Sequence, residues 1–311
     1  MKVFYIYLSL LIFLFACNST PEIDDATMLD GKIISDSSLI HPEKYLISAK
    51  YPSPDASQLN KPVLIAAHGY SATTFEWDEI RTFSNTDASF LVSQVLLGGH
   101  GRDYADFKAA TWKDWQSSII IEYEKLEKLG YKKIYLAGSS TGAPLIINLV
   151  KEGYFNQHIA PKGIFLIDPI IVPANKTLTL VGLLGPILGY STTELASGEK
   201  GKWYVYRPQE TLQQLMNLID MTRKDLEDGI TLPQSSFMKV YKSSVDDVAD
   251  PISALMIYKG IKTATGAKIE VEMEKSKLHV FTRLAGRDNY ALADSILQQK
   301  VFLEMRNKMI Q

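Results

Sequence analysis

Residues 133–144 read KIYLAGSSTGAP, and this stretch decides the predicted fold. Its first half is an apolar run typical of a buried strand, and the apolar residues over 143–150 follow at helical spacing. Between them stands GSSTG at 138–142, a G-x-S-x-G turn whose glycines lack the Cβ atoms that would clash where the chain turns most tightly. Such a turn projects Ser140 at the edge of a sheet as a nucleophile. The alternative is a plain strand-to-helix turn in which a serine caps the helix.

Strand and helix patterns alternate on both sides of this turn. Strands are predicted over residues 63–67, 90–97, 133–137, 163–167, 237–241 and 268–273, and helices over 111–129, 143–150, 251–261 and 289–309. This alternation predicts an α/β fold with a mostly parallel central sheet flanked by helices. Over residues 172–234 it gives way to apolar helical material and turns. We expect that insertion to form a helical cap over one end of the sheet.

The composition limits the possible classes of function. Of the 311 residues 46% are hydrophobic, and 33 lysines and arginines nearly balance 35 aspartates and glutamates. This much apolar material suits a single large domain. The formal net charge of −2 argues against a nucleic-acid binder, which needs a clustered basic face. A lone cysteine excludes a disulfide within the chain and a zinc site built from cysteine pairs.

The N-terminus reads as a targeting signal. Lys2 precedes an almost wholly apolar run that ends in LFAC at 14–17, where Cys17 is the only cysteine of the chain. The run has the proportions of a signal peptide and is shorter than a transmembrane helix of about 20 residues. Its end resembles the lipobox of bacterial lipoproteins, which implies a lipid anchor on the Cys17 thiol. We therefore expect a signal peptide over residues 1–16, a tether over 17–38 and a domain over 39–311.

A serine hydroxyl needs a base to accept its proton, and in folds with this turn the order along the chain is serine, acid, histidine. Five histidines are present, and only His158 and His279 follow Ser140. His158 comes after the helix that begins at the turn, and we expect it at the surface or at a helix end. His279 follows the predicted strand 268–273 and leaves room for an acid before it. We therefore predict that His279 is the base.

Four aspartates are candidates for the acid that fixes the histidine tautomer and stabilises the imidazolium. Asp246 is preferred, because it lies four residues beyond the predicted strand 237–241 and ahead of a helix that starts at a proline. Asp247 and Asp250 in the same loop remain alternatives. So does Asp168, which follows the preceding strand.

The charge that develops on a carbonyl oxygen during acyl transfer needs backbone N–H donors. Thr141, directly after the predicted nucleophile, supplies one. We expect the second from Tyr70, in the loop HGYS at 68–71 that follows the first strand, where Gly69 lets the chain turn sharply. His68 is expected to be a structural hydrogen-bonding residue.

Six segments together resemble the α/β-hydrolase family, and most closely its carboxylesterase and monoacylglycerol-lipase branch. In chain order they are VLIAAHGYS, LLGGHGRDYADF, TWKDW, YLAGSSTGAPL, SSVDDVADP and KSKLHVF. The resemblance implies a cap that shapes the substrate pocket, and it implies the roles given above for Ser140, Asp246, His279, Tyr70 and Thr141. The chain departs from the branch at Ser243, where the acid loop usually has glycine, and at Gly98-Gly99, where Pro-Gly is usual.

These features predict a membrane-anchored serine hydrolase that cleaves carboxylic esters through an acyl-enzyme. Its substrate would be a small-molecule ester or an acylglycerol, and no cofactor or metal is expected because every catalytic group is a protein group. The apolar segment 177–190 fits cap packing, a channel for an acyl chain, or a surface that contacts the bilayer to which Cys17 is anchored. An acyltransferase, thioesterase or peptidase could use the same triad, and a surface lipoprotein could use the fold only for binding. The Cys17 anchor predicts the bacterial cell envelope, at the outer membrane or the periplasmic face, and the sequence leaves the oligomeric state open.

Overall fold

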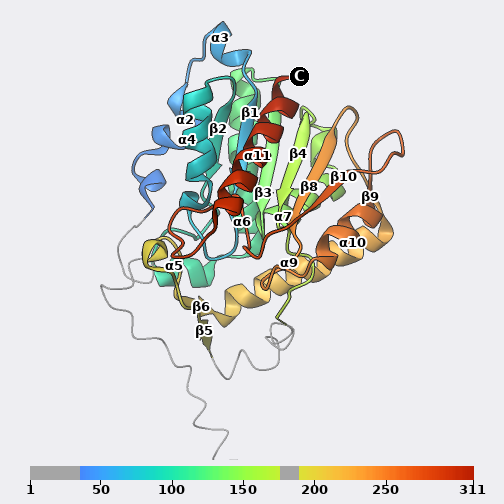
Figure 1. Cartoon of the computed structure of the whole chain (residues 1–311). Coiled ribbons are helices and arrows are strands. Elements are labelled where there is room, and N and C mark those ends of the chain that lie inside the picture. The colour runs from blue at the N-terminus through green and yellow to red at the C-terminus, as the bar shows by residue number, and fades with distance from the viewer. Residues whose placement is uncertain (1–35, 176–188) are drawn as a thin grey trace, which may run out of the picture.

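The computed structural model describes residues 36–175 and 189–311 (Figure 1). The predicted signal peptide, the predicted lipidation site Cys17 and residues 177–188 of the apolar segment lie outside these ranges. The predicted tether ends at residue 38, but Asp36 is already buried, and its carboxylate accepts hydrogen bonds from the N–H and the hydroxyl of Thr74. The packed part of the chain therefore includes Asp36, ahead of the predicted domain start at residue 39.

A sheet of six parallel strands forms the centre of the described chain, in the order β10-β8-β4-β3-β1-β2. The strands are β1 (Val63–Ala67), β2 (Leu91–Val95), β3 (Ile134–Ser139), β4 (Gly163–Ile167), β8 (Phe237–Ser243) and β10 (Glu270–Glu274). Each coincides with a predicted strand, so the predicted α/β class with a parallel sheet is confirmed. The sequence placed the end of β8 at residue 241, whereas the strand continues to Ser243.

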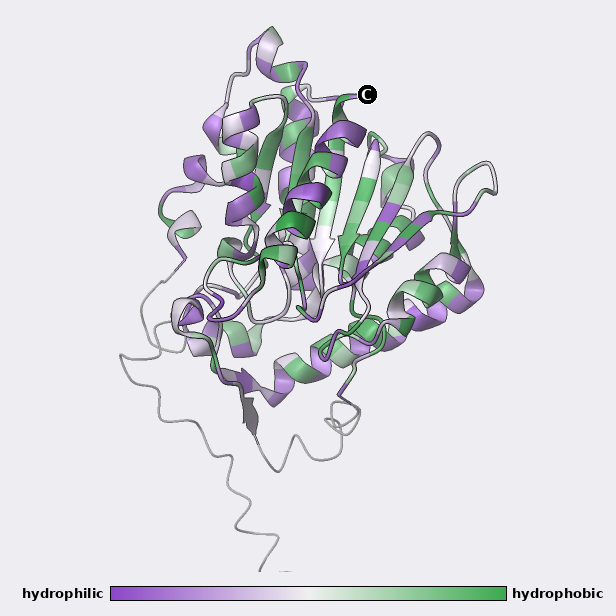
Figure 2. Ribbon diagram, viewed as in Figure 1, coloured by the Kyte–Doolittle hydropathy of each residue, from purple (hydrophilic) through white to green (hydrophobic). Residues whose placement is uncertain are grey.

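Helices cover both faces of the sheet. On one face lie α4 (Asp78–Asp87) and α11 (Leu292–Ile310), and on the other lie α6 (Trp112–Leu129), α7 (Gly142–Lys151) and α10 (Ile252–Gly260). Successive side chains of a strand point to opposite faces. Leu136 of β3 therefore packs in the core under α6 and α7, while Tyr135 packs under α11. Figure 2 shows the inner strands as mostly apolar, as expected of a parallel sheet covered on both faces, with hydrophilic positions on β8.

The described part of the predicted insertion lies at the end of the sheet where the strands finish (Figure 1). Its main element is α9 (Gln209–Asp228), and the short strands β5 (Tyr190–Thr192) and β6 (Tyr206–Pro208) pair antiparallel beside it. Leu215 and Leu218 of α9 are buried in the core that the helix shares with α7 and α10. These residues fix the helix over the carboxyl ends of the strands.

Shorter elements complete the described chain. They are α2 (Ile47–Lys50), α3 (Ala56–Leu59), α5 (Tyr104–Ala109), β7 (Ile230–Thr231) and β9 (Ile261–Lys262), with 3-10 turns η1 (Ser37–Leu39), η2 (Pro42–Lys44), η3 (Thr74–Trp77), η4 (Tyr154–Asn156) and η6 (Ser197–Glu199).

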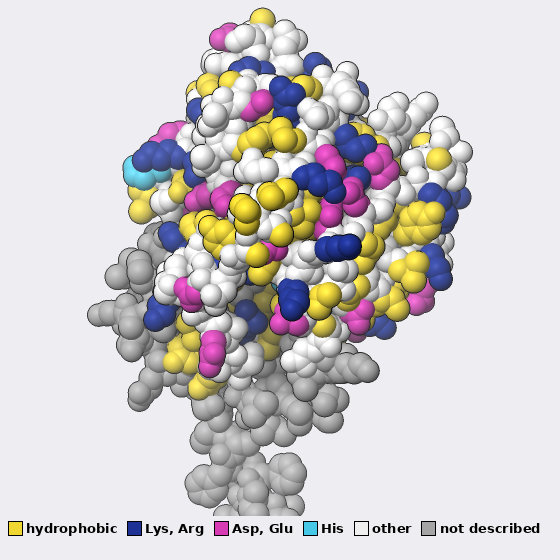
Figure 3. Space-filling model, viewed as in Figure 1, with side chains coloured by type: hydrophobic (Ala, Val, Ile, Leu, Met, Phe, Trp, Pro, Cys, Tyr) yellow, Lys and Arg dark blue, Asp and Glu magenta, His cyan; other side chains and the backbone are white. Residues whose placement is uncertain are grey.

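The face that carries α11 is mixed in character (Figure 3). Leu292 and Ile296 of this helix are exposed, and beside them Lys300 pairs with Glu272 and Glu274 of β10. Among the helices within residues 36–175 and 189–311, none has the length and hydropathy needed to cross a membrane.

Candidate active site

Ser140 lies in the turn between β3 and α7 with a φ of +47°, in the left-handed region. A Cβ atom built on Gly138 would lie 2.5 Å from the carbonyl carbon of Gly142, and one built on Gly142 would lie 2.3 Å from the oxygen of Ala67. Backbone atoms stand at both positions, so neither contact is relieved by moving a side chain. The two glycines of the G-x-S-x-G pattern are therefore required by this turn.

Backbone hydrogen bonds fix Ser140 against the neighbouring strand. Its N–H donates to the carbonyl of Ile167 at the end of β4 (3.0 Å), and its carbonyl accepts from the N–H groups of Ala143 and Ile170. Within the described ranges the Ser140 hydroxyl has no hydrogen-bond partner. Hydrogen bonds of a catalytic hydroxyl often tighten only when substrate is bound. The turn thus presents Ser140 at the carboxyl edge of the sheet, with a free hydroxyl.

Asp246 and His279 form a hydrogen-bonded pair at the same edge. His279 Nδ1 donates to Asp246 Oδ2 (2.8 Å), while Asp246 Oδ1 accepts the N–H groups of Val248 (2.8 Å) and Ala249 (3.0 Å). Burial raises the pKa of the Asp246 carboxyl, but the hydrogen bonds and charges of His279 and of the neighbouring Lys242 outweigh it, so that the pKa lies below its ordinary value. The carboxylate is therefore ionised at neutral pH, and it orients the imidazole with Nε2 directed away from it.

Asp168, the alternative acid after β4, has other partners. It is buried with a φ of +44°, and Oδ1 accepts hydrogen bonds from the N–H of Ser243 (2.7 Å) and from Lys242 Nζ (3.0 Å). Its second oxygen accepts the N–H of Phe281 (3.3 Å). Asp168 therefore joins the end of β4 to β8 and to the chain just after His279, without bonding the imidazole.

Neither of the two alternatives in the acid loop is hydrogen-bonded to His279. Asp247 is exposed. Asp250 accepts the N–H of Ile252 (2.9 Å) at the start of α10, as a capping side chain does. Of the four aspartates predicted as candidates, Asp246 is the one hydrogen-bonded to His279.

The loop after β1 brings Tyr70 beside the serine turn. The N–H of Gly69 is taken by the carboxylate of the buried Glu76 (2.8 Å). Within the described chain, no acceptor bonds the N–H groups of Tyr70 and Thr141. A Cβ built on Gly69 would lie 3.1 Å from the Ser140 Cβ, so the loop and the serine turn touch. Two free backbone donors therefore flank Ser140.

Two buried histidines hold this loop in place. His68 Nδ1 donates to the carbonyl of Gly69 (2.8 Å), and its Nε2 accepts the N–H of Leu97 (3.0 Å). His100 Nε2 accepts the N–H of Ser71 (3.2 Å). Burial lowers the pKa of His68, and burial is also the main cause that holds the pKa of His100 well below its ordinary value. Both rings are therefore neutral hydrogen-bonding residues, as expected for His68.

Lys242 is the residue at this site that the motifs do not indicate. Its side chain is fully buried between Asp168 and Asp246. A signal was present in the strand pattern, because Met238, Val240 and Lys242 share one phase of β8 and the first two are core residues. A lysine in an apolar phase needs a buried carboxylate partner, and the two aspartates supply it.

The cap meets the site through Tyr70. The hydroxyl of Thr211 in α9 donates to the carbonyl of Pro208 (3.0 Å), which leaves its oxygen to accept a hydrogen bond from the Tyr70 hydroxyl (2.6 Å). The guanidinium of Arg207 lies over the Tyr70 ring, 5.8 Å from its centre. The side chain of Tyr70 thus ties the cap to the loop that carries a free N–H donor.

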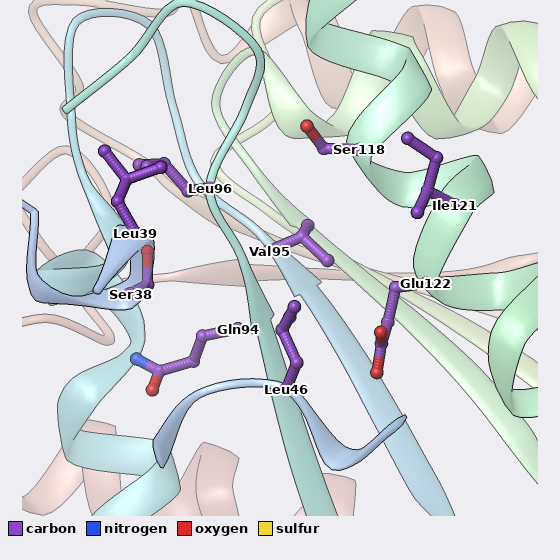
Figure 4. Close-up of a pocket in the computed structure, with 9 residues that line it drawn as sticks. All are labelled: Ser38, Leu39, Leu46, Gln94, Val95, Leu96, Ser118, Ile121 and Glu122. Carbon is purple, nitrogen blue, oxygen red and sulfur yellow. The ribbon is translucent and has the colours of Figure 1, made fainter. Parts of the chain in front are cut away.

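A separate pocket of about 170 Å³ lies at the side of the sheet, between η1, β2 and α6 (Figure 4). It is lined by Ser38, Leu39, Leu46, Gln94, Val95, Leu96, Ser118, Ile121 and Glu122. None of the predicted site residues lines it. Because β2 is the outermost strand on that side, this pocket is distinct from the edge that carries Ser140.

No protein-family model matches the sequence. Among solved structures, the chain is similar to one from work on the metagenome-derived lipolytic enzymes LipS and LipT, with a TM-score of 0.62 and 19% identity over 80% of this chain and 94% of that one. A soluble variant of monoglyceride lipase from Saccharomyces cerevisiae gives a TM-score of 0.61 and 12% identity, over 82% and 89%. Alpha/beta hydrolase domain-containing protein 10 from mouse gives 0.54 and 13%, over 79% and 90%. These likenesses confirm the predicted α/β-hydrolase fold.

Proposed function

We propose that this protein is a serine hydrolase that cleaves carboxylic esters through an acyl-enzyme intermediate. The observation that carries the proposal is the hydrogen bond between His279 and Asp246 (2.8 Å) at the sheet edge where the strained turn presents Ser140. A serine, a histidine and an acid in that order along the chain are the groups that nucleophilic acyl transfer needs. The similarity of the fold to lipolytic enzymes and to a monoglyceride lipase supports an ester as substrate.

Each group has one role in the proposed reaction. His279 accepts the Ser140 proton at Nε2 while the serine oxygen attacks the ester carbonyl, and Asp246 stabilises the imidazolium that results. The N–H groups of Tyr70 and Thr141 donate to the developing oxyanion. His279 then protonates the leaving alcohol, and a water activated by the same ring releases the acid from Ser140.

We also propose that the chain is held at a membrane of the bacterial cell envelope through lipid on Cys17. Support comes from the sequence, in which the only cysteine ends an apolar run of signal-peptide proportions. An anchored enzyme would meet acylglycerols or other small esters at the bilayer surface. Palmitate labelling of the wild-type protein and of Cys17→Ala, followed by membrane fractionation, tests the anchor. Labelling that survives the substitution would contradict it.

The function itself is tested with p-nitrophenyl esters of C2 to C16 acids and a form of the chain that begins at residue 18. We expect hydrolysis by the wild type, and a loss of about 10⁴-fold or more in Ser140→Ala with an unchanged circular dichroism spectrum. Ser117→Ala is the matched control, because it removes a serine hydroxyl that bonds the carbonyl of Asp114 within α6, away from the site, and it is expected to remain active. A fluorophosphonate probe should label the wild type and not Ser140→Ala. A folded wild type that neither hydrolyses any ester nor takes the probe would contradict the proposal and favour a binding role.

A further inference from the structure

Lys242 is a fully buried cation at the centre of the candidate site. Its Nζ donates to Asp168 Oδ1 (3.0 Å) and to Asp246 Oδ2 (2.5 Å), and the side chains of all three residues have no exposed surface. Burying three charges together is costly, and it is tolerated only where the charges pair with good geometry. Buried charges of this kind are therefore candidates for a role in the chemistry beside them.

The oxygen that binds Lys242 also binds the histidine. Asp246 Oδ2 accepts from Lys242 Nζ and from His279 Nδ1 (2.8 Å), while Oδ1 is filled by two backbone N–H groups. The ammonium and the imidazole thus compete for one carboxylate oxygen. A stronger bond to Lys242 weakens the pull of Asp246 on the His279 proton, because a carboxylate that already binds a cation attracts a second positive charge less.

Asp168 brings a second negative charge to the same place. Asp168, Asp246 and His279 each place one polar atom within 4.8 Å of the others, a spacing that a metal ion could also use. The Lys242 ammonium bonds both carboxylates there, so the structure assigns the cationic position to this lysine. The formal charges of Asp168, Asp246 and Lys242 beside the imidazole sum to −1. Without Lys242 the two carboxylates would leave a charge of −2.

Other charged groups near the histidine are fixed in their own contacts. Arg287 donates to the carbonyls of His279 and Val280, and Arg283 pairs with Glu199 (2.6 Å). Glu76 is bonded to the loop after β1, and Asp247 is exposed. None of these groups contacts Lys242, so changes at Lys242 and Asp168 leave them in place.

We propose that Lys242 is a positioning residue for the triad, which neutralises Asp168 and moderates the hold of Asp246 on His279 so that the imidazole can accept the serine proton. This inference rests on the proposed function. Two unopposed carboxylates beside the ring would favour the imidazolium, which cannot accept the serine proton. Lys242 and Asp168 are expected to act as a pair of opposite charges whose effects on His279 oppose one another.

The test measures the protonation of His279 directly, in the full-length chain in detergent, by NMR of ¹³Cε1-labelled histidine. The signal is assigned by its loss in His279→Gln. Asp168→Asn leaves Lys242 with one fewer anion, and we expect the midpoint of the His279 titration to fall by about one pH unit. Lys242→Met leaves two carboxylates, and the midpoint should rise by about the same amount. The double variant Lys242→Met/Asp168→Asn should lie between the two single variants.

A matched control is Lys239→Met on the same strand. Lys239 pairs with Glu272 (2.6 Å) on the face of β8 opposite to that of Lys242. The two lysines are three residues apart along the strand, which is about 10 Å. The Lys239→Met variant removes the same charge as Lys242→Met and should leave the midpoint of the His279 titration unchanged. The acid limb of kcat/KM on the ester substrates should move in the same direction as the NMR midpoint in each variant.

Opposite shifts in the two single variants, with the double variant between them, support the proposal. It is overturned if both single variants shift the midpoint in the same direction or shift it no more than Lys239→Met. If Lys242→Met does not fold, the downward shift in Asp168→Asn and its reversal in the double variant decide the matter. The NMR titration needs no turnover, so a protein that shows the shifts but hydrolyses no ester would contradict the proposed function and leave the charge coupling established.

Discussion

Two buried carboxylates in this molecule have opposite environments. Glu122 of α6 is 1% exposed, and it accepts hydrogen bonds from the hydroxyls of Ser48 and Ser93 (2.5 Å each) and from the Ser48 N–H (3.1 Å). The side chain of Asp246 is fully buried, and its donors include the ammonium of Lys242 and the imidazole of His279. Glu122 lies beside the side pocket of Figure 4, and Asp246 lies at the carboxyl edge of the sheet.

The difference lies in the charge of the donors. At Glu122 burial raises the pKa, and the neutral hydroxyls lower it by less than burial raises it. At Asp246 burial acts in the same direction, but charged donors reverse the result. Burial and hydrogen bonding alone therefore do not mark a catalytic carboxylate. An ionised interior carboxylate that is hydrogen-bonded to a histidine is the stronger candidate, and of these two sites only Asp246 has that bond.

The largest expected effect is on activity. Asp246→Asn should lower kcat/KM for p-nitrophenyl esters about 10⁴-fold, because the amide no longer stabilises the imidazolium or fixes the productive tautomer. Asp247→Asn is the matched control in the neighbouring exposed residue, and it should keep activity within about twofold. The measurement is steady-state kinetics at pH 7.5. Equal losses in the two variants would mean that the loop, rather than the Asp246–His279 pair, carries the effect.

The stability of the same variant should depend on pH in a defined direction. The folded pKa of Asp246 lies below the unfolded value of about 3.9, so its stabilisation is complete above that value and is lost as the pH falls toward the folded pKa. Asp246→Asn, which leaves buried donors unpaired, should cost about 3 kcal/mol at pH 7 and less at pH 3. Urea unfolding of wild type and variant at both values measures this. If the loss of unfolding free energy in Asp246→Asn grew as the pH fell, the folded pKa of Asp246 could not lie below the unfolded value.

A smaller effect is expected at the hydroxyl donors of Glu122. Ser93→Ala removes a donor from the carboxylate and an acceptor from the N–H of Ile47 (2.8 Å), which should cost about 1–2 kcal/mol of unfolding free energy. Thermal and urea unfolding measure this cost. The ester-hydrolysis rate should be unchanged, because Ser93 lies at the outermost strand on the side away from β10. A matching loss of activity would show that the two carboxylate sites are coupled.

The smallest effect is expected for Glu122→Gln. The folded pKa of Glu122 lies above the unfolded value, so the buried charge costs stability above the folded pKa, and the protein gains stability as the pH falls through it. The variant removes that charge and should lie within about 1 kcal/mol of wild type at pH 7. Its stability relative to wild type should decrease as the pH falls from 7 toward the unfolded carboxyl pKa of about 4.3, the direction opposite to that expected for Asp246→Asn on acidification. If the stability of both variants relative to wild type changed in the same direction as the pH fell, the two carboxylate sites would not differ as described.

The sequence predicted the sheet and the serine turn because both depend on local pattern. Buried parallel strands are continuous apolar runs, and the turn at Ser140 needs glycines at fixed spacing, so each is visible in a window of a few residues. The choice among Asp168, Asp246 and Asp247 could not be made in this way. It depends on which carboxylate reaches His279, and that is set by the end of β8 at Ser243 and by the register between strands distant in the chain.

Lys242 shows the same limit of predicting contacts from local sequence. Its position in an apolar phase of β8 was readable, but its partners lie on another strand end and on a loop, and no short window contains all three. The packing of Asp36 could not be read from the sequence for a similar reason. Asp36 looks like part of a polar linker until the fold brings Thr74 to it.

If the protein hydrolyses esters as proposed, the hydroxyl bridge between Tyr70 and Thr211 would make chain-length selectivity a matter of rate as well as of affinity. An ester whose tail contacts α9 would steady that helix, and through the bridge it would steady the loop whose N–H is proposed to donate to the oxyanion. Part of the tail's binding energy would then be used at the carbonyl, where it lowers the barrier, rather than in holding the ester alone. A preferred tail would therefore raise kcat, and Tyr70→Phe would flatten that dependence while leaving KM to follow the apolar contacts.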